Sequence, residues 1–138
     1  MAICYLGIGS NLGNRRKNIM SAIQKIGSLK ATKVLRISKI IETRPVGGPA
    51  GQGKFLNAAL KIQTRLTPLR LLSNLKKIEE SLGRPRYALR NSPRTIDIDI
   101  LFYSDKIIND KKLKVPHPRL LKRDFVITPL MEIINGKN

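Results

Sequence analysis

The sequence predicts an α+β protein with a ferredoxin-like split βαβ arrangement, in which helices pack on a mainly antiparallel sheet as an α/β/α sandwich. Three observations predict it: segments in which apolar residues alternate with period two, two segments with helical spacing, and their order β-α-β-β-α-β. The length of 138 residues suits one compact core, so a single domain is expected over residues 1–138. This fold hosts many functions and does not define one by itself.

The first half of the chain contains three predicted strands and one predicted helix. Apolar alternation begins at Cys4, and an isoleucine-rich helical spacing begins at Ile19. The predicted elements are a strand over 2–8, a glycine-containing turn, a helix over about 14–28, a strand over 33–43 with an irregularity near its end, a loop over 44–53 and a strand over 54–64.

The second half begins with a helix that Thr67 caps, with Pro68 at its first position and Gly83 at its end. Its predicted apolar stripe consists of Leu69, Leu72, Leu75 and Ile78. The elements predicted after it are a loop over 84–93, a strand over 95–103, a turn at 104–105, a short strand at 107–108, a loop through 115–118 and, from Arg119, a short helix and a last apolar segment.

The net charge is the unusual feature of the composition. Twenty-seven Lys and Arg against nine Asp and Glu give +18, which indicates a polyanionic partner: nucleic acid, anionic lipid or a phosphate-rich small molecule. The alternative is a generally basic proteome, in which most lysines only solvate the surface. No apolar run approaches the roughly 20 residues of a membrane span. A lone Cys4 and an N-terminus without a basic leader lead us to expect a protein of the reducing cytoplasm.

Two acidic residues stand in the predicted strand over 95–103. Alternation places Asp97 and Asp99 on one face, with their carboxylates about 6–7 Å apart, and the neighbouring isoleucines on the other. Mg²⁺ prefers one or two carboxylates together with phosphate oxygens and waters. The pair therefore predicts a metal site, whereas the alternative is a solvated outer face of the strand.

Basic residues surround this strand in the sequence. The segment before it contains no acid and four arginines, whose planar fork suits phosphate oxygens: Arg84, Arg86, Arg90 and Arg94. Beside two carboxylates, which would repel DNA, these arginines favour a nucleoside triphosphate; the alternative is a flexible basic loop. His117, the only histidine, lies between two prolines and is either incidental or a hydrogen-bonding partner of phosphate.

Several blocks of the sequence resemble the 6-hydroxymethyl-7,8-dihydropterin pyrophosphokinase family of folate biosynthesis. The most specific block is Pro93-Arg94-Thr95-Ile96-Asp97-Ile98-Asp99-Ile100. The other matching blocks lie at 7–13, 55–59, 83–86, 115–119 and 123–125. The chain departs from the family at Asn91 and Pro118, where relatives often carry aromatic residues. It also has a shorter C-terminus than many relatives, from which we expect lower stability rather than lost activity.

The resemblance implies transfer of pyrophosphate from ATP to the pterin alcohol, with AMP as the second product. It implies that Asp97 and Asp99 bind two Mg²⁺ and that Arg84 and Arg94 are catalytic. The ATP-binding residues that it implies are Glu79, Arg84, Arg86, Arg94, His117 and Arg123. Glu79 would bind nucleotide or only orient Arg84. The pterin-binding residues that it implies are Thr43, Val46, Phe55, Asn57 and Phe125.

Two other functions are compatible with parts of the sequence. A nucleic-acid-binding module on the same sheet would explain the charge, but such sheets stack bases on aromatic residues, and the central strands lack an aromatic-basic pattern. An inactive ATP-binding scaffold would require the loss of a polar site residue, and none is missing. We therefore expect a monomeric enzyme with ATP and the pterin as partners, and neither a membrane nor nucleic acid.

Overall fold

A computed structural model describes residues 1–44, 53–83 and 95–134. The elements are β1 (Ala2–Ser10), α1 (Arg15–Gly27), β2 (Thr32–Ile37), β3 (Ile41–Thr43), β4 (Phe55–Thr64), α2 (Pro68–Ser81), β5 (Asp97–Tyr103), β6 (Ile108–Asn109), β7 (Lys114–Val115), a 3₁₀ turn η1 (Leu120–Lys122) and α3 (Asp124–Ile134).

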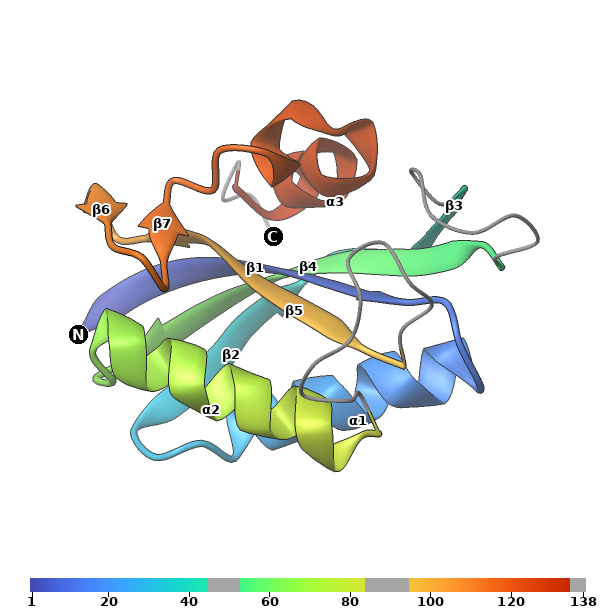
Figure 1. Ribbon diagram of the computed structural model, residues 1–138, viewed down its shortest axis with the longest axis horizontal. Coiled ribbons are helices and arrows are strands. Elements are labelled where there is room, and N and C mark those ends of the chain that lie inside the picture. Colours follow the sequence, from blue (N-terminus) through green and yellow to red (C-terminus); the bar gives the residue numbers. More distant parts are fainter. Residues whose placement is uncertain (45–52, 84–94, 135–138) are drawn as a thin grey trace.

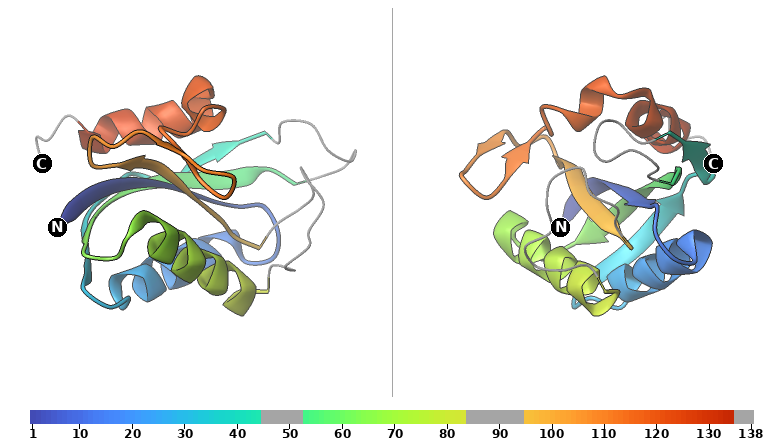
Figure 2. Two further views of the ribbon diagram at one scale, coloured as in Figure 1. Left: turned by 60° about the vertical axis from the view of Figure 1, so that its left-hand side comes forward. Right: turned by 45° about the vertical axis from the view of Figure 1, so that its right-hand side comes forward.

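The main sheet has the strand order β2-β4-β1-β5, and β3 also pairs with β4. All of these pairings are antiparallel. Helices α1 and α2 cover one face of the sheet, and α3 covers the other (Figures 1 and 2). The predicted α/β/α sandwich is therefore confirmed. The short strands β6 and β7 form a separate hairpin at one end of the sheet.

Side-chain caps begin helices α1 and α2, and a glycine follows the end of α2. The Asn14 side chain accepts a hydrogen bond from the Lys17 amide at 3.1 Å and caps α1. The Thr67 hydroxyl caps α2 in the same way, and Pro68 occupies the first turn. Beyond α2, Gly83 has a φ of +96°, a left-handed conformation that glycine adopts without strain.

The strand predicted over 33–43, with an irregularity near its end, is interrupted so strongly that it forms two elements. The ladder becomes irregular at Ser38, whose amide still donates to the Ala59 carbonyl at 2.9 Å. The Ser38 hydroxyl accepts the Ala59 amide at 2.8 Å, the place that a backbone carbonyl would take in a regular strand. Two strands, β2 and β3, result. The segment after Arg119 also differs from the prediction, since most of it forms the eleven-residue helix α3.

The apolar stripe predicted for α2 is partly wrong. Leu75 and Ile78 are buried as expected, but Leu69 is 44% exposed and Leu71 is buried instead. Leu71, Leu75 and Ile78 follow i, i+4, i+7 spacing, whereas the predicted stripe advanced by three residues at each step. Because steps of three drift about 60° around the helix each time, that stripe left the buried face at Leu69.

Two apolar clusters fill the sandwich. The larger one joins α1 and α2 to the sheet through residues such as Leu6, Ile8 and Ile98. The smaller one joins α3 to the opposite face through Ala59, Leu101 and their neighbours. Within the described ranges, no helix has the length and apolar character needed to cross a membrane.

Candidate functional site

The candidate site lies on the α3 side of the sheet, where β1 carries glycines. Leu6 and Ile8 of β1 face the larger cluster, so Gly7 and Gly9 face the α3 side. Gly9 pairs with Asn57 of β4 on one side and with Asp97 of β5 on the other, and Gly7 pairs with Asp99. The pairing therefore brings the amide and both carboxylates to one region of the sheet.

The two carboxylates occupy the positions that alternation predicted. Asp97 and Asp99 are half-buried, whereas Ile96, Ile98 and Ile100 are 0%, 5% and 2% exposed. The described residues contain no group of three or more His, Cys, Asp or Glu side chains that could hold a metal. Two carboxylates with room for phosphate and water ligands fit Mg²⁺ better than a metal that protein ligands must enclose.

Gly7 and Gly9 leave a strip of β1 without side chains on the α3 side, which we call the glycine floor. Asn57 lies next to this strip, opposite Gly9, and its amide is fixed by a hydrogen bond. Its amide nitrogen donates to the Thr43 hydroxyl at 2.6 Å. Its amide oxygen lies only 2.7 Å from the point where a Cβ on Gly9 would stand, and the Phe55 ring lies 3.5 Å from that point. Thr43, Phe55 and Asn57 therefore lie close together. Phe55 and Asn57 come close to the space that a side chain on Gly9 would fill.

Glu79 of α2 accepts a hydrogen bond from the backbone of β5. The residue is 6% exposed, and its carboxylate accepts the Ile98 amide at 2.7 Å. Because Ile98 lies between the two aspartates, this bond fixes the backbone that carries both of them. Glu79 thus has a positioning contact that the sequence did not predict.

Removing the Glu79 carboxylate should reduce stability. Glu79→Ala leaves a buried amide without this acceptor, which costs about 1–3 kcal/mol of unfolding free energy. Glu79→Gln retains an acceptor oxygen and should lose less. Urea unfolding measures the effect, and Glu80→Ala, at an exposed neighbour, is the control. An unchanged midpoint in Glu79→Ala would contradict this role.

His117 is fixed by backbone hydrogen bonds. Its amide donates to the Leu101 carbonyl at 3.2 Å, and its Nδ1 accepts the Arg119 and Leu120 amides at 3.3 and 3.2 Å. The neutral ring therefore carries its proton on Nε2, which remains a donor. Burial lowers the pKa of His117 below 6.5, and the nearby Asp97 carboxylate partly offsets this shift.

This lowered pKa predicts a pH dependence of stability. Below pH 6.5 the unfolded chain binds a proton at His117 more readily than the folded chain does, so stability falls as the pH falls through this range. Above pH 6.5 the contribution is constant. His117→Gln should remove this part of the dependence, which melting temperatures of the metal-free protein between pH 5 and 8 measure. Parallel curves for both proteins would contradict the assignment.

Phe125 and Arg123 lie at the start of α3. Phe125 packs against the smaller cluster, and the Arg123 guanidinium lies 5.9 Å from the centre of its ring. Both residues are thus on the face that carries the aspartates. The predicted site residues Val46, Arg84, Arg86 and Arg94 lie outside the described residues.

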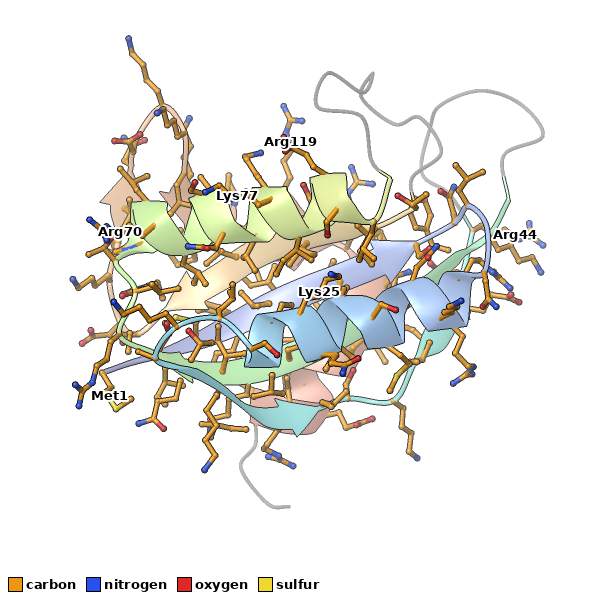
Figure 3. All side chains as sticks on the ribbon, turned by 90° about the horizontal axis from the view of Figure 1, so that it is seen from below. Met1, Lys25, Arg44, Arg70, Lys77 and Arg119 are labelled. Carbon is orange, nitrogen blue, oxygen red and sulfur yellow. The ribbon has the colours of Figure 1, made fainter. Side chains whose placement is uncertain are left out.

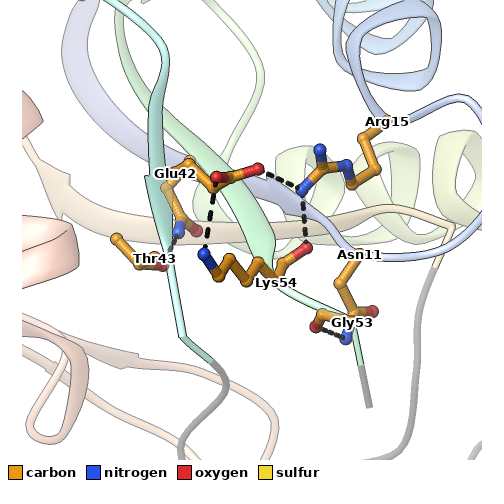
Figure 4. A network of polar contacts seen from close by, with 7 residues as sticks. Asn11, Arg15, Glu42, Thr43, Gly53 and Lys54 are labelled. Carbon is orange, nitrogen blue, oxygen red and sulfur yellow. Dashed lines mark hydrogen bonds and ion pairs between the residues drawn. The ribbon is translucent and has the colours of Figure 1, made fainter. Parts of the chain in front are cut away.

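One polar network was missed by the sequence analysis (Figure 4). Arg15 forms an ion pair with Glu42 at 2.9 Å and donates to the Lys54 carbonyl, and Asn11 donates to the Gly53 carbonyl at 3.2 Å. These contacts join the turn after β1 to the ends of β3 and β4, next to Thr43. A signal was available, because Glu42 is the only acidic residue among the first 78.

This face of the sheet carries paired carboxylates and an imidazole that can donate a hydrogen bond from Nε2. These groups are typical of enzymes that act on phosphate groups. Comparison with known proteins identifies the family. The model of the 7,8-dihydro-6-hydroxymethylpterin-pyrophosphokinase (HPPK) family matches residues 5–135, and the chain belongs to this family. It is accordingly an ATP-dependent pyrophosphokinase of folate biosynthesis.

Individual relatives agree with this assignment. The 2-amino-4-hydroxy-6-hydroxymethyldihydropteridine pyrophosphokinase of Aquifex aeolicus is 47% identical over 133 residues, which cover 96% of this chain and 81% of that protein. The Bacillus subtilis enzyme of the same name is 43% identical over 131 residues, covering 95% and 77%. The folic acid synthesis protein fol1 of Pneumocystis carinii is 48% identical over 129 residues, which are 94% of this chain but only 17% of that protein.

Solved structures share the fold. An HPPK-DHPS protein in complex with substrates matches with a TM-score of 0.58 and 19% identity, covering 92% of this chain and 31% of that one. Plasmodium falciparum HPPK-DHPS with pteroate matches with a TM-score of 0.59 and 17% identity, covering 95% and 34%. The chain therefore spans about a third of these larger proteins.

Proposed function

We propose that the chain transfers the pyrophosphoryl group of ATP to the hydroxymethyl group of 6-hydroxymethyl-7,8-dihydropterin. The substrate hydroxyl oxygen attacks the β-phosphorus, the bond from that phosphorus to the α-phosphate oxygen breaks, and AMP leaves as the hydroxyl loses its proton. The observation that carries the proposal is the row Asn57–Gly9–Asp97, in which an amide suited to a pterin edge lies two strands away from a carboxylate suited to Mg·ATP.

The pterin would lie on the glycine floor beside Asn57. An amide offers one acceptor and two donors, which match the mixed donors and acceptors of a pterin edge. Phe55 and Phe125 would contact the ring faces, and backbone groups near Thr43 and Val46 would complete recognition. The Thr43–Asn57 hydrogen bond supports this assignment, because it fixes the orientation of the amide before a ligand binds.

The triphosphate would lie over β5. Asp97 and Asp99 would hold two Mg²⁺, which supply positive charge to the phosphate oxygens when bound. His117 would donate from Nε2 to a phosphate oxygen without bringing a charge of its own. Arg84, Arg86, Arg94 and Arg123 would neutralise the developing negative charge, with Arg84 and Arg94 acting on the transferred group. Glu79 would support this region by fixing the backbone at Ile98.

We further propose that the protein acts as a monomer in a reducing cytoplasm and does not use its sheet for nucleic acid. Burial raises the pKa of the Cys4 thiol to about 12, so it stays protonated and unreactive at neutral pH. Both faces of the sheet are covered by helices, which disfavours stacking of bases on it.

The identity of the nucleotide product tests the reaction. With Mg·ATP and the pterin alcohol, AMP and the pterin diphosphate should form in equal amounts, because attack at the β-phosphorus expels AMP. Anion-exchange chromatography separates AMP from ADP, and a reaction without the pterin is the control. Accumulation of ADP instead would show transfer of a single phosphoryl group and would overturn the proposal.

A further inference from the structure

A second charged region lies on the outer side of α1 and α2, away from the candidate site. The two helices border a groove with a volume of about 580 Å³. Figure 3 looks onto this face and shows Lys25 on α1 and Lys77 on α2. Both lysines line the groove and both are exposed. Within the described part of the chain, neither forms an ion pair with a carboxylate.

The lining of the groove contains two lysines and no acidic residue, and the first part of the chain is basic throughout. Residues 1–78 contain fifteen of the 27 basic residues and only one of the nine acidic ones, Glu42. Helix α1 has no acidic residue, and the acids of α2 are the buried Glu79 and the exposed Glu80, neither of which lines the groove. An anion in the groove would therefore meet two ammonium groups without a carboxylate in the lining.

The other residues that line the groove restrict the chemical class of its ligand. Ser28 and Ser81 donate their hydroxyl protons to the carbonyls of Gln24 and Ile78, and the Asn74 amide donates to the Arg70 carbonyl, so the two lysines are the charged donors of the lining. The floor includes the apolar Leu29 and Ile78. The nine lining residues, all of them described, include no aromatic side chain on which a base could stack. This chemistry suits a compact, multiply charged anion rather than a nucleotide base.

We propose that the α1–α2 groove is a binding site for inorganic oligophosphate, held by Lys25 and Lys77 from its two walls. The volume exceeds that of one phosphate group and suits a short chain of them. In this proposal, part of the net charge of +18 serves to bind phosphate at a place where the transfer reaction does not occur. It is separate from the candidate active site, because α1 and α2 cover the opposite face of the sheet.

Titration calorimetry with inorganic tripolyphosphate tests the site. The active site is first saturated with Mg²⁺ and α,β-methylene-ATP, whose methylene bridge prevents pyrophosphoryl transfer. One further tripolyphosphate should bind, with an affinity that decreases as KCl increases. Lys25→Gln and Lys77→Gln should each weaken binding about threefold, and the double variant about tenfold, as expected for exposed charge contacts.

The control is Lys111→Gln with Lys112→Gln, which removes the same charge from exposed positions near the β6–β7 hairpin and should leave binding unchanged. The Lys25/Lys77 double variant should form AMP at the wild-type rate, so failure of the groove and failure of the proposed reaction are distinguishable. Equal losses in the control, no binding after the active site is saturated, or tighter binding of an oligouridylate RNA than of tripolyphosphate would each overturn the proposal.

Discussion

Replacing Asp97 or Asp99 with Asn is expected to lower turnover at saturating Mg·ATP by about a hundredfold or more. Asn keeps the size and one oxygen ligand but removes the charge that holds Mg²⁺, and charge stabilisation by a bound metal is worth several kcal/mol in the transition state. The metal-free fold should be no less stable. Repulsion between the carboxylates, about 2–3 kcal/mol at an effective dielectric near 20, is relieved in either variant.

Asp105→Asn makes the same chemical change at an exposed position in the turn after β5 and should leave turnover unchanged. Steady-state AMP formation and the melting temperature in EDTA are the two measurements. A purely structural pair would behave in the opposite way, because loss of one partner strands a charge. An Asp97→Asn protein that melts well below wild type yet turns over normally would disprove the metal site.

Gly9→Ala is expected to weaken pterin binding about tenfold to a hundredfold while Mg·ATP binding changes little. The added Cβ would stand 2.7 Å from the Asn57 amide oxygen, so the amide must move. That movement disturbs the Asn57–Thr43 hydrogen bond, and a buried polar group that loses its partner costs about 1–3 kcal/mol. Fluorescence titration with each substrate separates the two affinities.

Gly7→Ala provides a matched control on the same strand. A Cβ there would lie 3.6–3.8 Å from the Leu101 side chain, which is ordinary van der Waals contact. This variant should bind the pterin as wild type does. If Gly9→Ala also binds normally, or loses both substrates equally, then Asn57 belongs to the scaffold rather than to a pterin site.

Most regular elements, and the faces of the residues in β5, could be predicted from the sequence, because period and capping are local properties, although the apolar stripe of α2 was predicted only in part. The placement of Asp97 and Asp99 opposite the isoleucines required only strand alternation. The sequence predicted an irregularity in the strand over 33–43 but not its place at Ser38, because that depends on a hydroxyl that meets Ala59, a residue 21 positions away. The contact of Glu79 with Ile98 is equally non-local. The asparagine beside Gly9 was identified through family resemblance rather than through the physical pattern.

The Glu79–Ile98 hydrogen bond also bears on solubility. Strand β5 ends the main strand order, so its outer edge is a place where a strand of another molecule could add to the sheet. With the Ile98 amide already bonded to a buried carboxylate, an incoming strand would find this donor occupied and the flanking aspartates negatively charged. A group that positions the aspartates thus also protects this edge of the sheet against edge-to-edge aggregation.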